Sequence, residues 1–312
     1  MQPEQLQYHR LIRGIKKYRW WKPAVFALLA AVFGFTLTQI VTTIGILPLV
    51  LRDGVDGIES VVEIESRLIA LDTQDPYALG LALLSLVVWI PAILLAAWAM
   101  GFAPVGRLWS VAFRVRWRLL FKTLVPAFIS LILVQAVGMI YAAVGGFADE
   151  EVAIAEDFSR QSALISLVLV LILVPFQAAA EELMFRGALM QILGAWIKSP
   201  VIPIVLPSLL FALAHLYDPW ALVQVGILGI VAGWLTWRTG GLEAAISLHV
   251  INNLVVFLLL LTGITGETSQ SQDTGADVIA VLIQAASFVL YAMLVLRITH
   301  KMGITAPMRQ KR

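Results

Sequence analysis

Long apolar runs recur along the whole chain, and they restrict its fold more than any other feature. Backbone N–H and C=O groups inside lipid must be paired within the protein, so such a chain crosses the membrane as helices of about 20 residues. The runs occupy residues 23–51, 77–102, 121–146, 162–197, 201–216, 220–237, 242–262 and 277–296. The sequence therefore predicts an all-α fold, a polytopic transmembrane helix bundle of about eight spans.

The composition agrees with this interpretation and excludes several other classes of protein. Hydrophobic residues make up 60% of the chain and charged residues 13%, whereas soluble domains are about half apolar and about a quarter charged. The chain has no cysteine, which excludes disulfides, thiolate metal sites and a cysteine nucleophile. The net charge of +2 comes without a basic tract beyond what a membrane surface explains, so we expect contact with membrane lipid and no nucleic-acid partner.

The charges between the runs predict how the protein is oriented. Lysine and arginine gather in residues 1–22 and 103–122 and at the extreme C-terminus, whereas the connections 52–76 and 147–161 are acidic. Cytoplasmic connections carry the excess of lysine and arginine. We therefore expect a multi-pass protein of the cell membrane with both termini in the cytoplasm. Basic and aromatic residues alternate at 107–118, which is typical of a segment at the cytoplasmic membrane surface.

Charged residues interrupt the fourth run in the stretch AAAEELMFRGAL. A charge at this depth is costly, so it marks a candidate functional site. Glu182 and Arg186 are four residues apart and can pair on one helical face, whereas Glu181 points elsewhere. The spacing predicts one neutralised carboxylate and one that remains available.

Two later runs also carry polar residues at helical spacing. Phe211 and His215 are four residues apart, as are His249 and Asn253. Helix lengths counted from the intervening turns allow these side chains to converge with Glu181. Taken singly, each feature is explained by a structural clamp, a packed histidine or an interhelical hydrogen bond. Their combination in one region of the chain indicates a site.

In this order, the motifs resemble those of the CPBP family of intramembrane proteases, also called the type II CAAX prenyl endopeptidase or Abi family. The resemblance covers residues 162–262, and it implies an eight-helix integral membrane endopeptidase. The matching residues are Glu181, Glu182, Arg186, Phe211, His215, His249 and Asn253.

The resemblance also implies a role for each matching residue. Glu181 and His215 would activate a water molecule, and His249 and Asn253 would stabilise the oxyanion. Peptide hydrolysis needs both a base for the water and donors aimed at the developing oxyanion. The residues that would support the site are Glu182, Arg186 and Phe211.

On this basis the chain divides into four parts. Residues 1–22 form a basic cytoplasmic segment, 23–161 a three-span region, 162–262 the CAAX-protease-like catalytic core, and 263–312 an outer loop, the last span and a basic tail.

Metal dependence stays open, because the family is often labelled metalloprotease. Glu181, His215 and His249 would be a legitimate zinc set. The chain has no H-E-x-x-H motif, and we expect a glutamate-type site without a cofactor, with a divalent metal such as zinc as the alternative.

The expected substrate is a peptide or membrane protein, prenylated or not, or a peptide precursor such as a bacteriocin. Two other classes of function are kept as alternatives. One is a proton-coupled transporter, because membrane glutamate and histidine also line ion paths. The other is a non-catalytic membrane scaffold or immunity protein.

Overall fold

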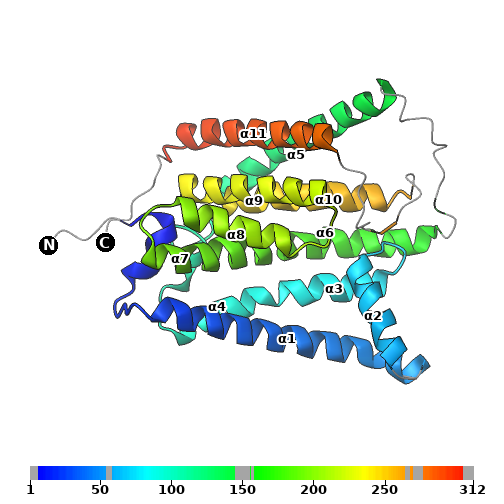
Figure 1. Cartoon of the computed structure of the whole chain (residues 1–312), viewed down its shortest axis with the longest axis horizontal. Helices are drawn as coiled ribbons and strands as arrows, with labels where there is room; N and C mark the ends of the chain where they lie inside the picture. Colours follow the sequence, from blue (N-terminus) through cyan, green and yellow to red (C-terminus); the bar gives the residue numbers. More distant parts are fainter. Residues whose placement is uncertain are drawn as a thin grey trace.

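The apolar runs form helices, and every regular element among the described residues is helical, as predicted. The computed structural model describes residues 6–53, 58–144, 155, 158–263, 268–269 and 277–304. Most helices run along the longest dimension of a single bundle (Figure 1). The basic tail and parts of the two long polar loops, 147–161 and 266–277, lie outside the described residues.

Seven helical segments in the described part of the chain are long and apolar enough to cross a membrane. The remaining predicted span, 201–216, the fifth along the chain, corresponds to the shorter apolar helix α8 (Val201–Leu213), which at about 1.5 Å per residue does not cross the hydrocarbon core alone. The seven are formed by α1 (Lys22–Asp53), α3 with α4 (Pro76–Val87 and Trp89–Ala99), α5 (Trp117–Val144), α6 with η3 and α7 (Arg160–Glu182, Leu183–Leu189 and Met190–Trp196), α9 (Pro219–Thr239), α10 (Glu243–Leu260) and α11 (Val278–Lys301).

The fourth run is one continuous helical segment that changes its winding in the middle. α6 ends at Glu182, the π-helix η3 follows directly, and α7 resumes the α-helical winding. A π-turn widens the helix by one residue and occurs frequently at functional sites. Here it begins immediately after the two glutamates.

α6 lies at the centre of the bundle, between two groups of helices. On one side it packs against α3, and α1 and α4 lie beyond (Figure 1). On the other side it packs against α10, which also contacts α5 and α9. α11 packs on α5 and α9, and α8 lies against α9. The predicted core 162–262 therefore corresponds to α6 through α10, although its limits as a domain stay a prediction.

One predicted connection contains a helix. The acidic segment 52–76 includes α2 (Ile58–Ala70), which lies across one end of the bundle beside α1 and α3 (Figure 1). Ile64 and Leu68, four residues apart, give it an apolar stripe that faces the bundle. An ion pair of 2.7 Å between Arg67 Nη2 and Asp75 Oδ2 ties the end of α2 to the start of α3.

Part of the basic surface predicted at the other end is in fact buried. The 3₁₀ helix η1 (Tyr8–Gly14) packs on α7, where Gly194 has no side chain that would overlap the carbonyl of His9. Arg107 is 3% exposed and donates hydrogen bonds to three backbone carbonyls, including that of Leu11 at 2.8 Å. η1 and Arg107 therefore pack within the bundle instead of facing lipid headgroups. The cytoplasmic location of this end stays a prediction.

Candidate active site

Glu182, the second of the two glutamates on α6, forms a buried ion pair with Arg186, as their spacing predicts. Arg186 Nη1 lies 2.8 Å from Glu182 Oε1, and both side chains are almost fully buried. Arg186 Nη2 also donates to the carbonyl of Gly229 on α9 at 3.1 Å. A Cβ at Gly229 would lie 3.1 Å from Arg186 Nη2 and 3.0 Å from Ser208 Cβ. Glycine at this position therefore lets α9 approach both the arginine and α8.

Phe211 links this pair to the two histidines. The Arg186 guanidinium carbon lies 4.6 Å from the centre of the Phe211 ring, a cation–π contact. The same ring meets His215 and His249 edge-on, at 4.8 and 5.5 Å between centroids. Phe211 therefore separates the two imidazoles and sets their positions relative to the ion pair.

His249 lies between the two glutamates. Its Nδ1 is 2.9 Å from Glu182 Oε1 and its Nε2 is 3.4 Å from Glu181 Oε2. The residue is 2% exposed and is not among the described residues that line the cavity beside Glu181. The sequence predicts that His249 and Asn253 face a substrate together, whereas the structure turns both nitrogens of His249 toward carboxylates.

Gln177 joins the site, although the sequence motifs do not include it. Its Nε2 donates to Glu181 Oε1 at 2.7 Å, and its Oε1 accepts from Asn253 Nδ2 at 3.1 Å. Asn252 Nδ2 in turn donates to Asn253 Oδ1 at 3.3 Å. Gln177 lies four residues before Glu181 in an apolar run, and that spacing was the signal that could have identified it.

A cavity of about 790 Å³ opens beside these residues. Its polar wall consists of Gln177, Glu181, His215, Tyr217 and Asn253, together with Thr38 and Ser66. Much of its apolar wall comes from α1 to α4, outside the predicted catalytic core. Among the apolar lining residues are Phe35, Ile69, Leu83, Leu86, Trp89 and Phe257.

His215 has one ring nitrogen free to act on the cavity. Its Nδ1 lies 2.8 Å from the carbonyl oxygen of Phe211. A carbonyl only accepts hydrogen bonds, so Nδ1 carries the proton and the neutral ring keeps a lone pair on Nε2. This tautomer suits a base or an acceptor for water.

Tyr217 is a second residue that the motifs do not include. It follows α8, its ring centre is 5.5 Å from that of His215, and it lines the cavity. Burial raises the pKa of Tyr217 to about 12, and the charge of Glu181 acts in the same direction. The phenol therefore stays protonated at neutral pH.

The residues present do not fit the alternative metal site. No three histidine, aspartate or glutamate side chains within the described ranges are placed to hold a metal ion. His249 directs both ring nitrogens at carboxylates, and His215 uses Nδ1 for a backbone carbonyl. The set Glu181, His215 and His249 would have to rearrange before it could bind zinc.

Comparisons with known proteins agree with the motifs. The model of the Rce1-like family, type II CAAX prenyl endopeptidase Rce1-like, matches residues 162–255, which include all seven motif residues. The uncharacterized protein YyaK of Bacillus subtilis (strain 168) is 31% identical over 112 residues, which are 34% of this chain and 38% of YyaK. The match thus spans well under half of that relative. No solved structure matches.

The family match supports a CAAX-type intramembrane endopeptidase in general, and the helical segments support a multi-pass membrane protein. The protein is therefore a polytopic membrane protein whose residues 162–255 match the model of the Rce1-like, type II CAAX prenyl endopeptidase family.

Proposed function

We propose that the protein is an integral membrane endopeptidase that hydrolyses a peptide bond within or near the bilayer. The observation that carries this proposal is that Glu181, His215 and Asn253, from three separate parts of the chain, line one cavity. A buried network behind the wall holds the first of them in place. The comparisons favour neither a transporter nor a scaffold.

Glu181 and His215 are the proposed activators of the water. Glu181 Oε1 is engaged by Gln177, whereas Oε2 accepts no hydrogen bond from any described residue and has His249 Nε2 at 3.4 Å. Glu181 lines the same cavity as His215, so its carboxylate is the proposed acceptor for the proton of a water held beside His215. A positioned base of this kind is what attack on an amide requires.

Asn253 is the proposed donor to the oxyanion. One N–H of its amide is directed at Gln177, which leaves the other for the carbonyl oxygen that becomes negative. Tyr217 lies on the same wall. His249, in contrast, is proposed to hold the two glutamates, because both its nitrogens are engaged behind the wall.

The proposed substrate is a peptide or membrane protein that reaches the cavity from the lipid. The apolar wall suits an apolar segment or a lipid-modified one. The test is a cleavage assay with the purified full chain in liposomes and a panel of tagged membrane peptides, prenylated and unmodified, with products identified by mass spectrometry. Cleavage of at least one peptide is expected. If every peptide stays intact, or if the Glu181→Gln variant cleaves equally well, the proposal is wrong.

Gln177→Leu is expected to lower kcat by about 100-fold with little change in KM, because misplacing reacting groups slows the chemical step. The substitution removes both the donor to Glu181 and the acceptor for Asn253. Gln39→Leu makes the same chemical change at an exposed position on α1 that does not line the cavity, and it serves as the control. An equal effect of both variants, or a change in KM alone, would contradict the positioning role.

Removal of metal is expected to leave cleavage unchanged, because we propose a glutamate-type site. The measurement combines elemental analysis of the purified protein with cleavage assays before and after dialysis against a chelator. Activity that disappears on chelation and returns with zinc would show that the three groups rearrange around a metal.

A further inference from the structure

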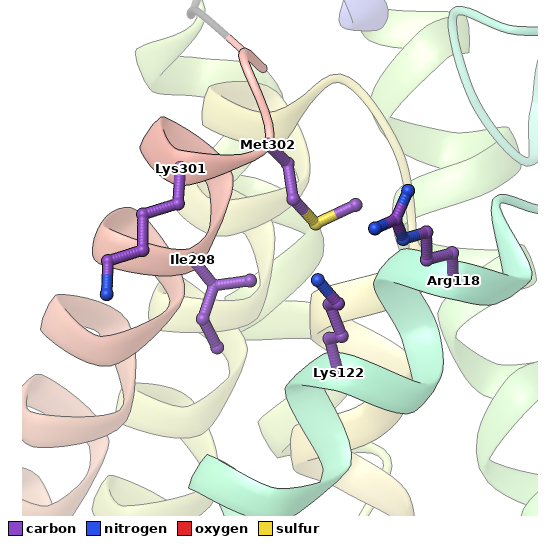
Figure 2. A pocket seen from close by; sticks show the side chains of 5 residues that line it. All are labelled: Arg118, Lys122, Ile298, Lys301 and Met302. Atoms are coloured by element: carbon purple, nitrogen blue, oxygen red, sulfur yellow. The ribbon is translucent and has the colours of Figure 1, made fainter.

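A second cavity, which shares no lining residue with the candidate active site, lies between the beginning of α5 and the end of α11. Its volume is about 350 Å³, and the two helices that flank it, α5 and α11, pack against each other in the bundle. The residues that line it are Arg118, Lys122, Ile298, Lys301 and Met302. Three of the five are cations, and the proposed reaction uses none of them (Figure 2).

These cations are not neutralised by the described part of the protein. No described acidic residue lines the cavity, and Arg118, Lys122 and Lys301 form no ion pair with any described residue. Arg116 differs, because its guanidinium lies 2.6 Å from Glu243 Oε2 and also donates to the Thr239 carbonyl. Arg116 is therefore paired within the protein, whereas Arg118, Lys122 and Lys301 keep N–H groups that can donate to a ligand.

The side chains are arranged for an anion that enters from the surface. In Figure 2, the ends of Arg118 and Lys122 reach from α5 toward the sulfur of Met302, and Lys301 extends along the outer side of α11. Arginine can offer two parallel N–H donors to a phosphate, and lysine adds a compact charge. Ile298 and Met302 supply an apolar floor.

The cavity also lies at the depth of lipid headgroups. The apolar segments of α5 and α11 begin at Trp117 and end at Lys301 respectively, so both helices change from apolar to charged at this level. Trp117 and Phe121 stack with ring centres 6.1 Å apart, and both are about 60% exposed. Exposed aromatic rings beside cations are typical of the membrane interface.

We propose that this cavity binds the phosphate of an anionic phospholipid. Arg118 and Lys122 donate to the phosphate oxygens, Lys301 adds positive charge from the far side of α11, and Ile298 and Met302 contact the glycerol and upper acyl carbons. Basic pockets between transmembrane helices bind such headgroups by the same chemistry. A soluble phosphate would use the cations alone, whereas a lipid also uses the apolar floor and the adjoining hydrocarbon surface.

The test is native mass spectrometry of the full chain in detergent, titrated with phosphatidylglycerol or with phosphatidylcholine. The wild type is expected to retain phosphatidylglycerol preferentially. Arg118→Gln/Lys122→Gln/Lys301→Gln is expected to weaken that binding by at least roughly tenfold. The control Lys16→Gln/Lys17→Gln/Arg19→Gln removes the same charges from exposed N-terminal positions and is expected to leave the affinity unchanged.

Three outcomes would overturn the proposal. Equal loss in the control variant would mean that general surface charge holds the lipid. Equal affinity for phosphatidylcholine would remove the requirement for an anionic headgroup. Inorganic phosphate that binds the wild type as tightly as the lipid would identify a site for the free ion. A folding defect is separated from a binding defect by the apparent Tm: the cavity variant should match the wild type without lipid and lose only the increase caused by phosphatidylglycerol.

Discussion

Glu181→Gln is expected to lower kcat for peptide cleavage by about 1000-fold, close to complete loss in a liposome assay. The amide has the shape of the carboxylate, and its oxygen can still accept the hydrogen bond that Gln177 donates to Oε1 at 2.7 Å. The variant therefore keeps the wall of the cavity but loses the carboxylate that takes the proton from water. The measurement is the rate of product formation at saturating peptide, with the apparent Tm as a check on folding.

The matched control is Glu65→Gln, which makes the same chemical change at an exposed position on α2. It is expected to cleave at the wild-type rate. His215→Ala should be nearly as inactive as Glu181→Gln, and the double variant should be little worse than either, because groups that act as a unit are not additive. Wild-type turnover by Glu181→Gln would remove Glu181 from the mechanism.

The parts of this protein that were predictable from sequence depend on local spacing. A helix of about 20 apolar residues is required by the bilayer whatever its neighbours are, so the helical bundle follows from the runs alone. The pairing of Glu182 with Arg186 follows from a separation of one helical turn. The short helix α8 departs from the predicted span because apolar length was counted past Leu213 into the connection.

The parts that were missed depend on which helices meet. The spacing of His249 and Asn253 places them on one face of α10. It does not indicate that His249 lies between Glu181 and Glu182 of α6. Gln177 belongs to the site because α6 and α10 bring it to Asn253. Arg107 is buried because η1 supplies a carbonyl for it, a contact across 96 positions that a count of loop charges does not detect.

Arg186→Met is expected to be the most destabilising of the substitutions considered, because it leaves the carboxylate of Glu182 buried without its cation. Breaking one partner from a buried pair costs about 3–5 kcal/mol. For a chain of this size that corresponds to a decrease in apparent Tm of about 10 °C. Both side chains are at most 1% exposed, so solvent screens the interaction little. The measurement is thermal unfolding of the purified protein in detergent, followed by circular dichroism.

Two further variants distinguish a buried charge from a general loss of packing. Arg67→Met breaks an ion pair whose side chains are 38% and 24% exposed, and it is expected to cost less than about 1 kcal/mol. Glu182→Gln/Arg186→Met removes both charges, so it should be more stable than Arg186→Met alone although it carries an additional substitution. The double variant could instead be the less stable of the two. In that case the stability lost in Arg186→Met comes from the contacts of the guanidinium with Phe211 and Gly229. His249 would then balance the charge of Glu182 without the arginine.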